Sequence, residues 1–237
     1  MPVGLDGNPD PVVTAARTQV LDVVADRVEE QDGARVLVGI DGRSGAGKST
    51  FADELGRVLQ GRGLAVVRST TDRFHRPRSE RMRQGATSAA GYVDDSHQLD
   101  AIVDALLVPF RSGEAVVRVG AFDEPSDLPA PIDVVVPERA VLVFDGLFVH
   151  RDELRPHWHA SVVLHADRRA DAAWLGYLEA GLPADPIARA DELDRRLQRA
   201  RWPRYRDGWR RYVESVGTVP EAVHIDNEDL AAPWIMR

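Results

Sequence analysis

The sequence predicts an α/β fold in which a parallel sheet carries helices on both faces. Short apolar runs rich in β-branched residues recur along the chain, at residues 35–40, 64–70, 140–145, 161–166 and 222–226. Segments with helical periodicity separate most of these runs, and such alternation is typical of a doubly wound parallel sheet. Hydrophobic residues make up 43% and charged residues 29% of the chain, which excludes collagen-like, disordered and coiled-coil classes.

The helical segments complete this pattern. Valine and alanine residues near a 3.6-residue period predict an amphipathic first helix. Other helical patterns stop at glycines or prolines, which commonly end helices. The expected helices are residues 11–30, 48–63, 96–110 and 167–181, and a helix that begins at Pro186.

A hairpin is expected next to the strand at residues 140–145. Two β-rich runs, residues 114–122 and 132–137, flank a proline-rich segment. The chain has 237 residues, and domains average ~150 residues. We therefore expect a single domain spanning residues 1–237, in which residues 1–32 form an N-terminal helical segment.

The charges are unevenly distributed. The chain has 30 basic and 38 acidic residues, giving a formal net charge of −8. Residues 73–83 nevertheless hold five arginines against one glutamate, and residues 195–211 hold eight arginines against one aspartate. Such focused positive charge on an acidic chain indicates a local anion site rather than a surface that coats nucleic acid. Lys48 is the single lysine among the 30 basic residues, so arginine must be unsuitable at that position.

Several classes of protein are excluded by what the sequence lacks. There is no cysteine, so a disulfide framework, a thiolate nucleophile and a cysteine zinc site are ruled out. No apolar run approaches the ~20 residues of a membrane-spanning helix. The first ten residues have neither the basic nor the apolar part of a signal peptide. We therefore expect a cytoplasmic protein without a membrane partner.

The strongest motif follows the first predicted strand. Residues 42–49 read GRSGAGKS and match the phosphate-loop pattern G-x-x-x-x-G-K-[ST] between a strand and a helix. Glycines leave the backbone N–H groups of such a turn free to approach phosphate oxygens, and the following helix adds its positive end. Together with the alternation of strands and helices, this motif predicts a P-loop NTPase-type fold. The expected nucleotide-binding residues here are Gly42, Ser44, Gly45, Ala46, Gly47, Lys48, Ser49 and Thr50.

Two side chains of this loop have a specific chemical role. The compact ammonium of Lys48 can reach β- and γ-phosphate oxygens where a planar guanidinium would not fit. The Ser49 hydroxyl can coordinate the Mg²⁺ that accompanies ATP. A P-loop protein also needs an acid at the end of a buried strand, and Asp145 ends the run AVLVFD. We therefore expect Ser49 and Asp145 to hold the metal.

Asp72 is the best candidate for a catalytic base. It follows the strand at residues 64–70, and ligands of doubly wound sheets bind at the carboxyl ends of the strands. A carboxylate near the γ-phosphate could accept the proton of an acceptor hydroxyl. The alternative is a structural role, as a helix cap or as an ion-pair partner of Arg73 or Arg76.

Three segments together resemble the uridine kinases and their relatives, the phosphoribulokinases. They are GRSGAGKST, TDRFH and VFDGLFVHRDELRPHWHASVVLHADRR, and the resemblance extends over roughly residues 35–230. It implies that Asp72 takes the proton from a primary hydroxyl and that Phe74 and His75 flank the acceptor. Asp145 would stand where a glutamate is more usual.

The resemblance also implies an acceptor-site insertion with a hairpin over about residues 72–135. GYVDDSHQLD is similar to the segment that closes the ribose side of the site, which makes Tyr92, Asp94 and Asp95 candidates. RVGAFDEPSDLP resembles the hairpin that covers the base, with Phe122 and Asp123 in the place of a tyrosine–aspartate pair. The histidine that follows this pair in the family is missing, which counts against pyrimidine recognition.

The C-terminal part resembles a lid and an adenine pocket. The arginine-rich stretch is similar to the lid that closes over the transferred phosphoryl group, over about residues 185–211. Its candidate clamps are Arg196, Arg199 and Arg201, with Arg199 also a nucleotide contact, and the alternative is a solvated helix face. Trp202, Tyr205 and Trp209 have helical spacing and favour a core role. Asn227 lies where these kinases hold adenine, although a plain turn is the alternative.

The function that these observations favour is an ATP- and Mg²⁺-dependent kinase of a small hydroxylated molecule, with a nucleoside as the leading acceptor. Another small alcohol, such as a pantothenate-like compound or a sugar phosphate, is the first alternative. A P-loop ATPase whose arginine stretch binds nucleic acid is the second, and a pI of 5.4 argues against it. A nucleotide-binding scaffold without catalysis is the third. The sequence does not decide the oligomeric state, so a homo-oligomer stays open.

Overall fold

The computed structural model describes residues 14–199 and 202–236, and in these ranges it describes the side chains of all residues except 198–199 and 202–203. Within this part of the chain, no helix is both long enough and apolar enough to cross a membrane.

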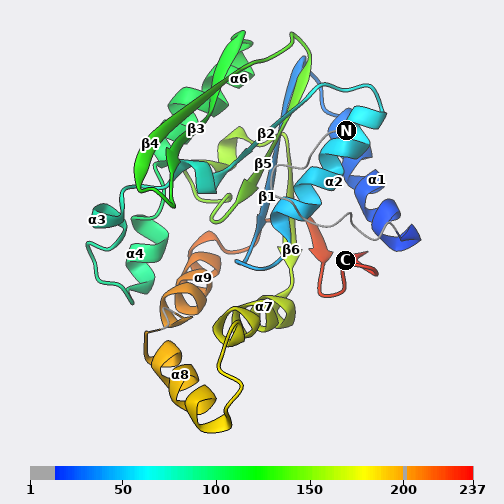
Figure 1. Ribbon diagram of the computed structural model, residues 1–237. Coiled ribbons are helices and arrows are strands. Elements are labelled where there is room, and N and C mark those ends of the chain that lie inside the picture. Colours follow the sequence, from blue (N-terminus) through cyan, green and yellow to red (C-terminus); the bar gives the residue numbers. More distant parts are fainter. Residues whose placement is uncertain (1–13, 200–201, 237) are drawn as a thin grey trace.

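A six-stranded sheet forms the centre of the molecule (Figure 1). Its strand order is β2-β5-β1-β6-β7-β8, and each neighbouring pair is parallel except β7 and β8. All residues of β1 and β5 are buried, as the continuous apolar runs predict. The strands are β1 (Arg35–Gly42), β2 (Val66–Thr70), β5 (Ala140–Gly146), β6 (Ala160–His165), β7 (Val223–Asp226) and β8 (Trp234–Ile235).

Helices and a hairpin cover the two faces of this sheet. On one face, α1 (Ala15–Glu29) and α2 (Lys48–Gly61) pack their apolar residues against β1, β5, β6 and β7. A second apolar cluster lies on the other face. It is built from a continuous helical segment and from the antiparallel hairpin of β3 (Val116–Asp123) and β4 (Leu128–Val135). The predicted doubly wound α/β fold with a hairpin is therefore confirmed.

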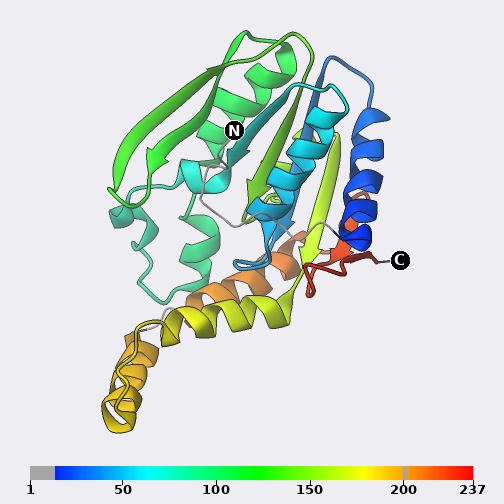
Figure 2. The ribbon, with the colours of Figure 1, turned by 45° about the vertical axis from the view of Figure 1, so that its right-hand side comes forward.

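The remaining helices, apart from η3 just before β6, lie near the carboxyl ends of the parallel strands. A short turn, η1 (Thr71–Phe74), follows β2 directly, and α9 packs against α4. In Figure 2, α7 and α8 extend away from the sheet and α9 returns beneath it. These elements are α3 (Arg78–Arg81), α4 (Ala89–Asp94), η3 (Arg155–His157), α7 (Asp167–Glu179), α8 (Pro186–Arg199) and α9 (Trp202–Val216).

One predicted helix differs in its course. Instead of a regular helix over residues 96–110, the chain forms α5 (Leu99–Ile102), a π-helical turn η2 (Val103–Leu107) and α6 (Val108–Ser112). Pro109 lies inside α6. Proline has no N–H to donate to the carbonyl of residue 105, so a regular α-helix would lack a backbone hydrogen bond here. The wider π-helical turn before Pro109 loses less hydrogen bonding than a regular α-helix would.

Candidate active site

The phosphate loop connects β1 to α2 at the centre of the sheet edge. Gly47 has a φ of 87°, a left-handed conformation that strains any residue with a side chain, and a Cβ at this position would lie 2.7 Å from the guanidinium of Arg169. Helix α2 begins at Lys48, and no side chain caps its first turn. The N–H groups of that turn are therefore available to an anion.

A buried polar network supports the loop from behind. The side-chain amide of Asn227, which is 0% exposed, donates to the Ala46 carbonyl at 2.7 Å. Its oxygen accepts from Arg17 of α1 at 2.6 Å, and the same guanidinium donates to Glu54 of α2 at 2.7 Å. The Asn227 side chain thus positions the phosphate loop. The predicted contact of this residue with adenine stays a prediction.

The Lys48 side chain has carboxylates around it. Its Nζ donates to the Arg43 carbonyl at 3.0 Å, which turns the ammonium back over the loop. Burial lowers the pKa of Lys48, and the negative charges of Asp72, Asp145 and Asp41 offset part of this decrease. The single lysine of the chain is therefore within electrostatic reach of three carboxylates at this sheet edge.

Asp145 lies at the end of β5, beside the loop. Its carboxylate accepts from the Ser49 hydroxyl at 2.8 Å and from the Arg68 guanidinium at 2.9 Å. Gly146 follows it, and a Cβ there would lie 2.1 Å from the Thr71 hydroxyl oxygen. A hydroxyl and a carboxylate are both oxygen donors, the kind that Mg²⁺ prefers. Ser49 and Asp145 thus fit the metal that was predicted for them.

A second buried carboxylate anchors helix α9 to the start of the loop. Asp41 accepts from the Gly42 N–H at 2.8 Å and contacts the His150 ring at 2.9 Å and the Tyr212 hydroxyl. Burial alone would raise the pKa of Asp41, but the hydrogen bond and charge of His150, together with the Tyr212 hydroxyl, hold it below its usual value. The sequence analysis did not find this cluster.

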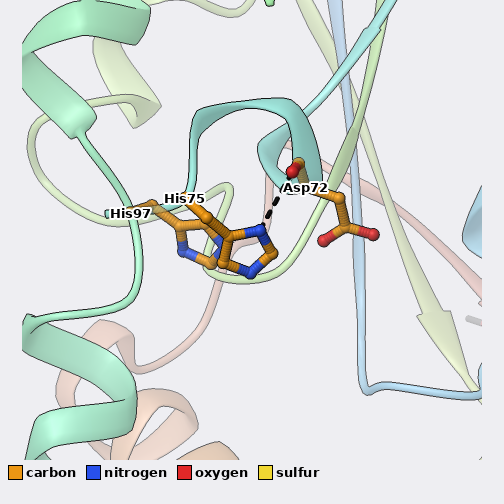
Figure 3. Close-up of side chains that lie close together, drawn as sticks. All are labelled: Asp72, His75 and His97. Carbon is orange, nitrogen blue, oxygen red and sulfur yellow. Dashed lines mark hydrogen bonds between the residues drawn. The ribbon is translucent and has the colours of Figure 1, made fainter. Parts of the chain in front are cut away.

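The turn η1 presents Asp72 to the acceptor side. The Thr70 hydroxyl accepts from the Asp72 N–H at 3.3 Å and so caps this turn, while the Asp72 carboxylate is exposed. The Nδ1 of His75 donates to the Asp72 carbonyl at 2.9 Å, and His97 lies directly beside the His75 ring (Figure 3). Burial holds the pKa of His97 well below its usual value, so this imidazole is neutral at pH 7.

A cleft of about 1360 Å³ lies over this edge of the sheet. Ser49, Asp145, Asp72 and His75 line it. It extends from the phosphate loop past Asp72 to the hairpin, with α7 and α9 along another wall. Its apolar and aromatic lining is combined with a few charged groups, as is usual in small-molecule sites. Of the predicted site residues it contains Ser44, Gly45, Ser49, Asp72, His75, Tyr92, Phe122, Asp123, Asp145 and Arg196.

Other predicted acceptor residues are not part of this lining. Phe74 is 0% exposed and packs into the apolar cluster beneath the hairpin, so its side chain does not flank the cleft. Asp95 is buried, and its carboxylate accepts from Arg83 at 2.8 Å and from Gln84 at 2.9 Å. Asp94 pairs with Arg151 at 3.6 Å. The two aspartates therefore stabilise the segment around α4.

The hairpin contributes to the cleft an aromatic ring and a carboxylate that is already hydrogen-bonded within the hairpin. Phe122 lines the cleft with a side chain that is 5% exposed. Asp123 accepts both the N–H of Ser126 at 3.0 Å and its hydroxyl at 2.5 Å. These bonds turn the Asp123 carboxylate back into the hairpin turn.

The arginine-rich stretch has several structural roles. Arg196 donates to the carbonyls of Leu178 at 2.9 Å and Ala180 at 2.7 Å, which ties α8 to the end of α7 at the cleft. The Arg199 side chain and Arg201 lie outside the described residues. Arg204 was not among the candidates, yet it is 1% exposed and donates to four backbone carbonyls in residues 81–91.

The aromatic residues of α9 combine two roles. Tyr205 and Trp209 pack against the apolar cluster around Tyr92, in agreement with the predicted core role. They also line the cleft, and the rings of Tyr92 and Tyr205 meet edge to face at 4.9 Å. Trp202 has no described side chain.

Sequence reasoning missed the partners that come from distant segments. Arg68 is the clearest case, because an arginine inside the apolar strand β2 is a signal in itself. Its guanidinium contacts Asp53, Asp145 and the Val143 carbonyl. The His150 ring and the Tyr212 hydroxyl, which hold Asp41, have no such signal in the sequence around them.

Comparisons with known proteins agree with this geometry. The family described as phosphoribulokinase/uridine kinase matches residues 37–174, and a comparison with curated proteins finds no match. A possible uridine kinase from Bacillus stearothermophilus has 18% sequence identity and a TM-score of 0.64, over 86% of this chain and 96% of that one. A candidate fructose transport system kinase from Silicibacter sp. TM1040 has 18% identity and a TM-score of 0.63, over 87% and 97%.

The D-glycerate 3-kinase from Cryptococcus neoformans var. grubii has 11% identity and a TM-score of 0.56, over 94% of this chain and 100% of that one. Identities this low show a shared fold alone. The family match, by contrast, covers more than half of the sequence and includes both the phosphate loop and Asp145. On that basis the chain belongs to the phosphoribulokinase/uridine kinase family and is an ATP-dependent small-molecule kinase.

Proposed function

We propose that this kinase transfers the γ-phosphoryl group of Mg²⁺–ATP to a hydroxyl of a small acceptor, with Asp72 as the base. The observation that carries the proposal is the shared cleft, which Ser49, Asp145 and Asp72 all line. Asp72 and Asp145 both act on Lys48 through their charges. The phosphate side and the acceptor side therefore lie within electrostatic reach of one ammonium.

The phosphate side would act by positioning and charge. The N–H groups of the first turn of α2 would bind phosphate oxygens, and Lys48 would stabilise the negative charge of the transferred group. Ser49 and Asp145 would hold Mg²⁺, which supplies further positive charge to the phosphates. Arg68 would keep the Asp145 carboxylate oriented. Arg196 is the described candidate for a clamp from the lid.

Asp72 would take up the proton that the attacking hydroxyl loses. Its carboxylate is exposed to the cleft, and its position is fixed by the cap from Thr70 and the bond from His75 to its carbonyl. A base that is held in place before the substrate binds avoids the entropic cost of orienting it during the reaction. Removal of the hydroxyl proton typically contributes a factor of ~10² or more to the rate.

A nucleoside is the first candidate acceptor. The aromatic rings of Tyr92, Phe122, Tyr205 and Trp209 line the cleft, and a planar base would pack against them. The Asp123 carboxylate is occupied by Ser126, so it would offer little discrimination between bases.

An anionic acceptor, such as a sugar phosphate, is the second candidate. Arg73 lines the cleft next to Asp72 and makes no hydrogen bond or ion pair with any residue that the structure describes. A half-buried guanidinium without a partner favours an anionic group of the substrate at this point.

An ADP-release assay over a panel of nucleosides, sugar phosphates, hydroxy acids and vitamin alcohols tests the proposal. Asp72→Asn should keep ATP binding and lose turnover by at least ~10²-fold; near-normal turnover would remove Asp72 as the base. Arg73→Met should raise KM at least ~10-fold for an anionic acceptor and leave KM for a nucleoside unchanged. Arg206→Met, an exposed arginine of α9, is the matched control.

A further inference from the structure

We propose that Asp72, His75 and His97 form a binding site for a divalent cation that prefers imidazole ligands, such as Zn²⁺. This site would be separate from the Mg²⁺ position at Ser49 and Asp145. A cation held there would occupy the Asp72 carboxylate and block phosphoryl transfer. The inhibitory part of this inference rests on the proposed role of Asp72 as the base, whereas the binding part does not.

The three side chains provide a zinc-type donor set. One potential ligand atom from each residue lies within 4.8 Å of the other two, and Figure 3 shows the two rings side by side with the Asp72 carboxylate next to them. Two imidazoles and one carboxylate are a common set in zinc sites, where bonds of ~2.1 Å place tetrahedral ligand atoms ~3.4 Å apart. The ligand atoms must therefore come closer by up to ~1.4 Å. Asp72 is exposed and His75 half-buried, so their side-chain torsions can supply this movement.

The backbone already holds the two histidines together. His75 and His97 form an isolated antiparallel bridge. On either side of it, the Arg76 N–H donates to the Ser96 carbonyl at 3.0 Å and the Gln98 N–H donates to the Phe74 carbonyl at 2.8 Å. Their ring centroids lie 4.8 Å apart. Because backbone hydrogen bonds hold the two histidines side by side, most of the cost of bringing the ligands together is met by the fold itself.

Each of the two rings keeps a nitrogen without a hydrogen-bond partner among the described residues. The Nδ1 of His75 contacts the Asp72 carbonyl, which can only accept, so Nδ1 carries the proton and Nε2 keeps a free lone pair. Metal-bound histidines commonly donate their second nitrogen to a backbone carbonyl in this way. His97 is 3% exposed, and its Nε2 has no hydrogen-bond partner among the described residues. A buried polar nitrogen without a partner is rare in native structures.

Ligand chemistry separates this site from the nucleotide metal. Mg²⁺ prefers oxygen ligands and keeps several waters, which suits Ser49, Asp145 and the phosphates. Imidazole nitrogens suit Zn²⁺, Co²⁺ and Ni²⁺. The histidine site should therefore take up these ions when Mg²⁺ is in large excess.

The binding test uses the full-length protein without nucleotide. Co²⁺ is titrated and followed by its visible absorption bands, and Zn²⁺ binding is measured by equilibrium dialysis and by displacement of Co²⁺. His75→Gln and His97→Gln should each weaken binding at least ~10-fold, since even loss of a supporting residue around a metal ligand costs that much. The control is His165→Gln, which alters the other close histidine pair, with His224 at 2.9 Å. Its binding should match the wild type.

Two binding results would overturn the site. One is the absence of Zn²⁺ binding at submillimolar concentration. The other is binding by His75→Gln that equals the wild type while both give the same far-ultraviolet circular dichroism. Because His97 is buried and its replacement can unfold the chain, His75→Gln is the deciding variant.

The inhibition test uses the kinase assay at saturating Mg²⁺–ATP. Zn²⁺ should abolish wild-type activity in proportion to occupancy of the site, and a chelator should restore it. His75→Gln, compared with its own metal-free rate, should need at least ~10-fold more Zn²⁺. If Zn²⁺ binds and activity is unaffected, the inhibitory role is wrong. If no acceptor is phosphorylated, the proposed function fails while the spectroscopic result still decides the site.

Discussion

Replacing Arg204 with methionine tests whether one buried arginine holds the wall of the cleft together. Arg204 lies on α9 and is 1% exposed. Its guanidinium donates to the carbonyls of Arg81 at 2.8 Å, Gly85 at 3.2 Å, Ser88 at 3.1 Å and Gly91 at 3.2 Å. It therefore joins α9 to the segment that contains α3 and α4.

The expected loss of stability follows from these four bonds. Methionine fills much of the same volume against the Tyr92 ring, but it removes four hydrogen bonds. The carbonyls of Gly85, Ser88 and Gly91 keep a backbone N–H donor. At ~1 kcal/mol net for each lost bond, the total is ~4 kcal/mol. Some of this is regained because a buried charge is removed. We therefore expect a decrease in the free energy of unfolding of about 3 kcal/mol or more.

Urea unfolding followed by circular dichroism provides the measurement, with Arg206→Met as the control. Arg206 is two residues along the same helix, is exposed and pairs with Asp207 at 3.1 Å. Loss of such a pair costs ~0–1 kcal/mol. The reasoning is refuted if the two variants have free energies of unfolding within about 1 kcal/mol of each other.

Three further predictions concern single residues. Gly146→Ala should destabilise the fold by about 1–3 kcal/mol in urea unfolding, because the new Cβ would lie 2.1 Å from a side-chain oxygen; Gly176→Ala, in open space on α7, should be neutral or stabilising. Burial lowers the pKa of His97 in the native state, so the unfolded chain binds a proton that the native chain does not. Stability should therefore fall as the pH decreases below about 6.5, by about 1.4 kcal/mol per pH unit for this one group; an unchanged slope in a His97→Gln variant would contradict it. Arg68→Met should raise the Mg²⁺ concentration needed for half-maximal activity about 10-fold, because Asp145 loses its guanidinium partner; an equal requirement in both proteins would show that this bond does not orient Asp145.

The sheet could be predicted because its central strands are buried on both faces. β1 and β5 are continuous apolar runs, so their positions are readable without knowledge of their neighbours. β4 was partly hidden, since Pro129 and Pro131 lie inside it. Prolines are tolerated there because the hairpin has only two strands and leaves one edge of each unpaired. β8, with two residues, is too short to give a pattern.

The site was predictable where its residues stand at the ends of strands that the sequence reveals. The loop at residues 42–49 and Asp72 follow strands and Asp145 lies at the end of one, and the parallel sheet brings these distant positions together. Arg68 and Tyr212 reach the same region only through tertiary structure. No local signal distinguishes Tyr212 from any other aromatic residue of an amphipathic helix.

The support that Asn227 gives to Ala46 connects two distant parts of the chain in time as well as in space. A growing polypeptide acquires the whole glycine-rich motif first, and the side chain that steadies the motif is made about 180 residues later. Until then the nascent kinase has the residues of the phosphate loop, but the loop lacks the support of the Asn227 side chain. A translation intermediate stalled before β7 should therefore bind ATP poorly, so nucleotide capture waits until residue 227 has been made.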